Sequence, residues 1–257
     1  MMQTSFRQVR LVIWIAAVCF LSLAGAARAQ DSKPAPGWTF QVTPYLWLAG
    51  INGDVTTPRG NSASFDLSIG DVLSHLDGGL MLEGEARYRR WGILADFDYA
   101  KLSGDGSFGP LLGTPNVEVK EYLGTLDGGY RFVDMDSLKL DGLVGFRVMS
   151  IDTSLSFSGN ILAPRSDNAS ATWADPLVAV RAIVPMGPRF FASGYADVGG
   201  GPDGDLTWEV WGGLGYSFDA TFAAYAGYRY LAMNHDIKNV SLNINQGGPL
   251  IGLGIRF

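Results

Sequence analysis

The chain has 257 residues, of which 47% are hydrophobic and 12% aromatic, with 34 glycines, one cysteine and a formal net charge of −6. An acidic chain lacks the basic surface that binds nucleic acid, and one cysteine cannot build a disulfide framework or a thiolate metal site. We therefore expect no nucleic-acid partner, no cofactor and no resident metal.

The first element is an export signal. The first ten residues carry two arginines and no acid, an apolar run follows from Leu11 to Ala24, and Ala27–Arg28–Ala29 has the small residues of a cleavage site. This run of 14 residues is shorter than the roughly 20 that a membrane-spanning helix needs. We predict Sec-type export and cleavage after Ala29, so that residues 1–29 are a signal peptide and residues 30–257 are the mature domain.

Beyond the signal, the dominant pattern is alternation. Every second residue from Ile251 to Phe257 is apolar, and the residues between them are glycine or arginine. Successive side chains of a β-strand face opposite ways, so this period of two indicates a strand with two different faces. The same pattern predicts ten strands, at about 38–50, 79–89, 91–103, 117–132, 138–154, 171–185, 189–199, 205–218, 221–233 and 248–257.

The connections between these strands alternate in length. The short ones lie near Arg90, Asp134–Asp136, Gly187 and Asp219, and the long ones near 51–78, 104–116, 155–170, 200–204 and 234–247. Short turns at one end and long loops at the other are typical of outer-membrane barrels. No apolar run after the signal is long enough for a spanning helix, which leaves a closed barrel as the way to cross lipid. We predict an all-β, closed antiparallel transmembrane barrel of about ten strands (range 8–12), with short periplasmic turns and long extracellular loops.

Charged residues in the predicted strands favour one phase, which we assign to the lumen because a charge facing lipid is costly. The lumen charges are Glu83, Glu85, Arg87, Arg89, Asp96, Asp98, Asp127, Arg131, Lys139, Asp141, Arg147, Asp175, Arg181, Asp197, Glu209, Arg229 and Arg256. Three exceptions, Glu118, Lys120 and Asp152, fall near predicted loop ends. A soluble β-sandwich would instead direct its charges outward.

Aromatic residues of the opposite phase collect near the strand ends, as expected of the two girdles at membrane interfaces. The periplasmic girdle would hold Trp38, Tyr88, Trp91, Tyr130, Phe132, Phe190, Phe218, Phe222 and Phe257, and the outer one Tyr99, Tyr122, Trp208 and Tyr230. Phe257, as a C-terminal aromatic, is also predicted to be the signal for the barrel assembly machinery.

Two features fit the pattern poorly. Pro44 and Pro176 fall within strands, where proline removes a ladder donor, so we expect a bulge or a strand end at each. Apolar residues of the segment Phe65–Leu76 have helical spacing, which predicts a short amphipathic helix that caps the barrel or folds into it. If residues 62–69 form a strand instead, twelve becomes the next even strand count.

Several motifs resemble those of uncharacterised proteobacterial outer-membrane barrel proteins, loosely grouped with OmpA-like and porin-like barrels. They are Pro44–Tyr45–Leu46–Trp47, Phe65–Leu76, Trp173–Ala174–Asp175–Pro176, residues 194–200 and Gly227–Tyr228–Arg229–Tyr230–Leu231. The resemblance covers nearly the whole mature chain. It implies fold and an outer-membrane location, and it brings no activity or catalytic residue.

A ten-stranded barrel has a narrow interior. One possibility is a salt-bridged lumen that simply fills the barrel, and the other is a small passive channel. Bases such as Arg87 and Arg131 fall toward the periplasmic end and acids such as Asp175 and Glu209 toward the outer end, which predicts an axial polarity of charge. Expected partners are outer-membrane lipids including lipopolysaccharide, the assembly machinery and periplasmic chaperones.

Two other functions stay open. The two histidines, His75 and His235, fall in the first and last long loops, where a His–Asp pair with Asp71, Asp77 or Asp236 would activate water or bind a cation. Gly-x-Ser-x-Gly and His-Glu-x-x-His are absent from the sequence, so we expect no enzyme of those kinds. Loops rich in Gly, Asn, Ser and Asp would also suit an adhesin.

Overall fold

A computed structural model describes residues 37–56, 60, 62–105, 114–158, 165–201, 205–237 and 240–257. The chain divides into residues 1–38, nearly all outside the described part, and Thr39–Phe257. The predicted signal peptide at 1–29 lies outside the described residues. No helix in the described part is long and apolar enough to cross a membrane.

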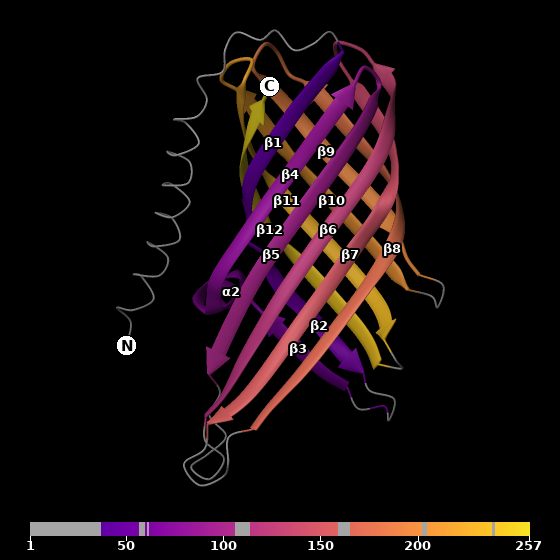
Figure 1. Cartoon of the computed structure of the whole chain (residues 1–257). Coiled ribbons are helices and arrows are strands. Elements are labelled where there is room, and N and C mark those ends of the chain that lie inside the picture. Colours follow the sequence, from indigo (N-terminus) through magenta and orange to yellow (C-terminus); the bar gives the residue numbers. More distant parts are fainter. Residues whose placement is uncertain are drawn as a thin grey trace. The chain divides into compact units, whose positions relative to one another are not determined.

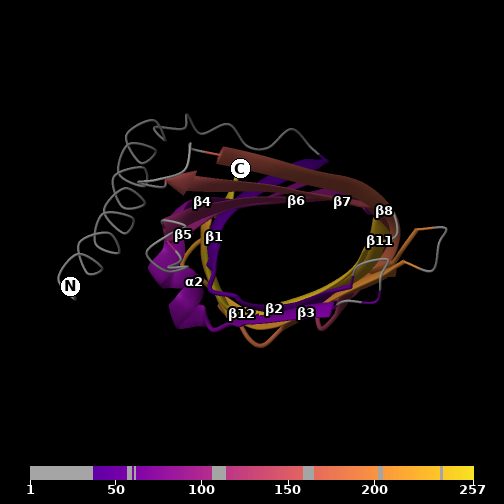
Figure 2. The ribbon, with the colours of Figure 1, turned by 90° about the horizontal axis from the view of Figure 1, so that it is seen from below.

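Ten strands form a closed antiparallel ring within Thr39–Phe257 (Figures 1 and 2). They are β1 (Trp38–Trp47), β4 (Leu76–Tyr88), β5 (Trp91–Asp105), β6 (Thr114–Asp134), β7 (Lys139–Ser158), β8 (Arg165–Pro185), β9 (Phe190–Gly199), β10 (Leu206–Ser217), β11 (Phe222–Ile237) and β12 (Val240–Arg256). Strands β4 to β12 pair in chain order, and β1 closes the ring by pairing with both β4 and β12. The predicted closed barrel of ten strands is confirmed.

The two ends of the barrel differ in their connections. Strands are joined at one end by the turns at 89–90, 135–138, 186–189 and 218–221, and this is the short-turn end. The other end, which we call the long-loop end, holds the remaining connections. Strands β6, β7 and β8 have 21, 20 and 21 residues and extend at the long-loop end beyond their predicted bounds.

The prediction of a long loop at 234–247 is wrong. Strand β11 continues to Ile237 and β12 begins at Val240, and the two pair without interruption from Phe222↔Ile255 to Ile237↔Val240. The polar residues Asn243 and Asn245 alternate with the apolar Leu242 and Ile244, which is a strand pattern hidden by its asparagines.

The first connection holds two further strands, β2 (Gly50–Thr56) and β3 (Ser62–Leu67). Strand β2 continues β1 and takes over the pairing with β12, from Gly50↔Gly247 to Thr56↔Ser241, and β3 pairs with β2. The sheet therefore has twelve strands, but the ring has ten because β1 pairs with β12 directly. The strand considered at 62–69 exists without changing the size of the barrel.

The predicted helix is also present, as α2 (Ile69–His75). A capping box begins it: the Asp71 backbone N–H donates to Ser68 Oγ (3.2 Å), and the Ser68 N–H donates to Asp71 Oδ2 (3.0 Å). The hydrogen bond from the Ser68 side chain, and then that from its backbone, lowers the pKa of Asp71. Helix α2 has no buried residue and lies outside the ring near β2, β3 and β5, so it neither caps nor enters the lumen (Figure 2).

The outward face of the barrel is apolar between two aromatic bands. Near the short-turn end, Trp91 and Tyr130 make an edge contact at 4.9 Å. Toward the long-loop end, the ring centroids of Tyr99 and Tyr122 are 4.9 Å apart, and those of Trp208 and Tyr230 are 5.2 Å apart. These are residues of the two predicted girdles, and tyrosine and tryptophan favour membrane interfaces.

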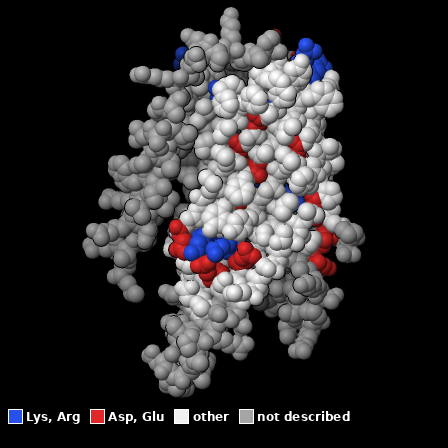
Figure 3. Space-filling view, in the orientation of Figure 1, with Lys and Arg blue, Asp and Glu red and all other residues white. Residues whose placement is uncertain are grey.

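Beyond the second band the outer wall becomes charged. Lys101 Nζ lies 2.8 Å from Glu118 and 3.5 Å from Asp77, and Lys120 Nζ lies 2.9 Å from Glu118. Figure 3 shows a wall that is mostly uncharged apart from scattered acidic residues, with a mixed group of basic and acidic residues toward the long-loop end. Glu118 and Lys120 are two of the three charges predicted not to share the inward phase. They therefore lie beyond the end of the apolar belt.

Candidate functional site

The lumen contains two groups of ion pairs. The first, toward the short-turn end, is the Asp141 cluster, which consists of Glu85, Arg87, Arg131, Asp141 and Arg181. Asp141 accepts from three arginines, at 2.7 Å from Arg87, 2.8 Å from Arg131 and 2.8 Å from Arg181. Glu85 bridges Arg87 and Arg181, at 2.8 Å from each. Three cations and two anions from β4, β6, β7 and β8 are thus held together.

The second group, the Arg229 network, crosses the middle of the lumen. Arg229 Nε lies 2.9 Å from Glu209 Oε1, Nη1 lies 2.9 Å from Asp98 Oδ2, and Nη2 lies 3.1 Å from Asp96 Oδ1. The hydroxyl of Tyr45 lies 2.6 Å from Asp98 and 2.8 Å from Asp96, and it accepts from Arg229 Nη1 at 2.8 Å. One guanidinium from β11 therefore connects β1, β5 and β10.

Arg147, on β7, extends the Arg229 network to the far wall and is only 1% exposed. Its Nη2 lies 2.6 Å from Asp197 and 2.8 Å from Glu209, so that Glu209 joins the two arginines. Thr207 accepts from Arg147 Nη1 at 3.0 Å. Buried charges need this degree of pairing, because removing an ion from water is expensive.

A third, apolar group fills the lumen beyond the Arg229 network. We call it the apolar layer, and its buried members are Tyr45, Trp47, Ala49, Leu123, Met149, Trp173, Leu231, Met233 and Ile244. Trp47 also lies under the Arg229 guanidinium, 4.6 Å from ring centroid to Cζ. The pattern of charges does not predict this layer. Its signal was present, since Leu123 shares the phase of Glu121 and Thr125.

The predicted lumen residues divide among these groups. Asp127 accepts from the Tyr195 hydroxyl at 2.8 Å, and Glu83 is half-buried on β4. Arg89, in contrast, was assigned to the lumen but lies exposed in a short turn at φ 55°, with its guanidinium 5.4 Å from the Tyr88 ring centroid. The Arg229 network holds more acids than bases, and the Asp141 cluster, nearer the short-turn end, holds more bases than acids. This distribution agrees with the predicted axial polarity, in which bases lie toward the short turns and acids toward the long loops.

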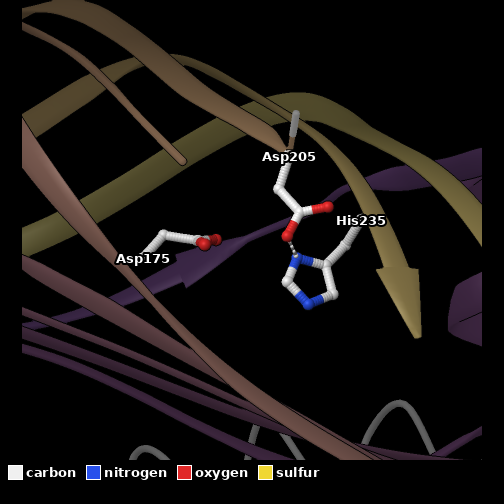
Figure 4. A group of neighbouring side chains, drawn as sticks. All are labelled: Asp175, Asp205 and His235. Carbon is white, nitrogen blue, oxygen red and sulfur yellow. Dashed lines mark ion pairs between the residues drawn. The ribbon is translucent and has the colours of Figure 1, made fainter. Parts of the chain in front are cut away.

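A smaller site occupies the mouth of the barrel at the long-loop end, and we call it the mouth site: Asp175 of β8, Asp205 beside β10 and His235 of β11 (Figure 4). One ligand atom from each lies within 4.8 Å of the others. His235 Nδ1 is 2.9 Å from Asp205 Oδ2. The imidazole also stacks on Trp173, with centroids 4.8 Å apart and an interplanar angle of 13°.

The wall of the barrel explains why these residues meet. Pairing of β8 with β9 stops at Leu177↔Gly199, next to Pro176, which has no N–H to continue the ladder on that side. The bulge or strand end expected at Pro176 is not found, because β8 runs through it and pairs with β7 at Phe146↔Pro176; only the pairing with β9 ends there. Strand β1 likewise continues through Pro44. Strand β8 continues past the end of β9, and Asp175 comes to face Asp205 and His235 (Figure 4).

The histidine site expected from sequence is corrected in two ways. His235 is not in a loop but on β11, facing inward, and its partner is Asp205 rather than Asp71, Asp77 or Asp236. His75 lies on α2 outside the ring, where its ring approaches Gly104 of β5. The two histidines thus belong to different surfaces, because β11 continues as a strand past the residue where a loop was expected.

Phe257 directly follows β12 at the short-turn end. Its backbone pairs with Phe40 in both directions at 3.0 Å, and the two rings stack with centroids 6.0 Å apart. The side chain is 63% exposed on the rim. Its role as an assembly signal stays a prediction.

No protein-family model and no curated protein sequence matches this chain. Among solved structures, the outer-membrane protease OmpT of Escherichia coli is similar at 9% identity and a TM-score of 0.54, over 90% of this chain and 99% of OmpT. Ail of Yersinia pestis (16%, TM-score 0.39, 87% and 100% covered) and the Neisserial surface protein NspA (15%, TM-score 0.36, 86% and 97% covered) are also similar. The likeness to OmpT establishes a fold shared with outer-membrane β-barrels.

Proposed function

We propose that this protein is an integral outer-membrane barrel with a closed lumen, which does not conduct and which places its function at the long-loop end. Short turns face the periplasm in such barrels, so the mouth site faces the outside. The apolar belt and the two aromatic bands support the membrane location. Outer-membrane lipids including lipopolysaccharide would cover the belt, after Sec-type export and delivery by periplasmic chaperones to the assembly machinery.

The Arg229 network is the observation that best supports a closed lumen. Its two arginines and four carboxylates join β1, β5, β7, β9, β10 and β11 across the lumen. A passing ion would have to break these pairs and then cross the apolar layer, whose hydrophobic side chains do not replace its water. We therefore favour a filled barrel over the small passive channel.

Planar-bilayer recording and liposome swelling test closure. We expect the refolded wild-type protein to give neither conductance steps nor swelling with a small sugar, because the lumen is blocked at two successive levels. A general porin reconstituted in the same vesicles serves as positive control. Reproducible wild-type steps whose size changes in Arg147→Gln would show that ions cross the Arg229 network, and would overturn the proposal.

A surface hydrolase is the second candidate, and the Asp205–His235 pair is the observation that favours it. A carboxylate beside an imidazole can orient the ring and support its action as a general base. If this function is correct, refolded protein should cleave a peptide or lipid ester substrate, and His235→Gln and Asp205→Asn should lose the activity. His75→Gln should keep it. Failure of the wild type on both substrate classes would count against this candidate.

A further inference from the structure

The mouth site contains a buried carboxylate oxygen without a partner. Asp175 is 3% exposed, and its Oδ1 has no hydrogen-bond partner although it is buried from solvent. The salt bridges of the described residues include none to Asp175, since the nearby Arg147 is engaged by Asp197 and Glu209. A buried carboxylate left unsatisfied is costly, so its presence indicates that something else fills its coordination.

The neighbouring side chains of His235 and Asp205 also lack a well-formed hydrogen bond to each other. His235 Nδ1 and Asp205 Oδ2 are 2.9 Å apart, yet they are not aligned as a hydrogen bond. Figure 4 shows the Asp175 carboxylate pointing toward this pair. Three ligand groups, from β8, β11 and the residue before β10, therefore lie close together, and no lysine or arginine of the described residues forms an ion pair with any of them.

We propose that Asp175, Asp205 and His235 bind a divalent transition-metal ion of the Zn²⁺ type. One imidazole and two carboxylates suit zinc better than calcium or magnesium, which prefer all-oxygen sets. With bonds of about 2.0–2.2 Å, the ligands of a tetrahedral zinc ion lie about 3.3–3.6 Å apart. The ligand atoms here lie within 4.8 Å of one another, so they must draw closer by about 1 Å to hold the ion.

The surroundings hold the ligands in place. Trp173 lies two residues before Asp175 on β8 and stacks on the His235 ring, which limits the rotation of the imidazole. The backbone N–H of Asp236 donates to Asp205 Oδ1 at 2.9 Å, leaving Oδ2 for the ion. Three protein ligands leave a fourth position for water or an external ligand, on the side that the proposed orientation opens to the medium.

Isothermal titration of Zn²⁺ into refolded, chelator-treated protein tests the site directly. We expect one ion per chain at micromolar Zn²⁺, with millimolar Mg²⁺ unable to compete. Loss of an outer-shell partner alone weakens a metal site about 10–100-fold, so Asp175→Asn and His235→Gln should each weaken binding at least tenfold. Co²⁺ in the wild type should give the visible absorption of a nitrogen-ligated tetrahedral ion.

Two variants serve as controls. His75→Gln removes the other histidine, on α2, and Asp236→Asn neutralises the acid next to His235 on the same strand. Both should bind Zn²⁺ like the wild type. No binding by the wild type, equal binding by His235→Gln, or loss of binding in His75→Gln would each overturn the proposal. The test is made in detergent and needs no membrane, so its outcome is independent of whether the lumen conducts.

Discussion

Replacing Arg229 with methionine is expected to lower the free energy of unfolding by about 3–5 kcal/mol, the cost of removing one partner from a buried ion pair. Arg229 is 4% exposed and contacts Glu209, Asp98, Asp96 and the hydroxyl of Tyr45. Methionine fills part of the volume but leaves the carboxylates facing one another in a space closed to water. Urea titration of the protein in lipid vesicles, followed by tryptophan fluorescence, measures the change.

Arg256→Met is the matched control for this loss. Arg256 also points inward, but it lies at the short-turn end, is only partly buried and bonds to the neutral Gln41 and Tyr225. We expect it to cost about 1 kcal/mol, the net value of an ordinary hydrogen bond. Adding Asp98→Asn and Glu209→Gln to Arg229→Met should restore part of the lost stability, since it neutralises two of the three carboxylates that Arg229 contacts. Equal losses in the free energy of unfolding for Arg229→Met and Arg256→Met would contradict a special contribution of the Arg229 network to stability.

Replacing Leu126 with arginine is expected to destabilise the folded protein in the bilayer by about 2–4 kcal/mol, because the charge would face hydrocarbon. Leu126 is 41% exposed on the outward face of β6, midway along that strand between Tyr122 and Tyr130 of the two aromatic bands. The same vesicle unfolding assay gives the value.

Phe132→Arg tests the depth dependence of this cost. Phe132 is on the same strand and face, but it lies beyond Tyr130 toward the short turns, where the cost should fall to about 0–1 kcal/mol. A large difference between the two variants locates the hydrocarbon belt between the aromatic bands. Similar small costs at both positions would instead indicate that water surrounds this face.

The alternation of residues determined the side of the wall that each strand residue occupies. A strand has a period of exactly two, so Asp141, Arg147 and Glu209 could be assigned to the interior from their phase alone. Turn residues near Arg90, Gly187 and Asp219 fixed the short connections in the same local way. Where polar residues occupy the outward phase, as at Asn243 and Asn245, the pattern is weak and predicts a loop in place of the strand that the structure has.

Partners inside the barrel were decided only by the tertiary structure. Phase places Arg229 and Asp98 in the lumen, but their contact depends on the stagger of β5 against β11, which no local pattern encodes. The mouth site depends on three strand lengths. Strand β9 ends at Gly199, β8 continues past that point, and β11 extends beyond His235. The sequence by itself determined a barrel with its charges inside, because each face is set by neighbouring residues. Which charges meet, and which one stays unpaired at the mouth, was decided by the closure of the ring.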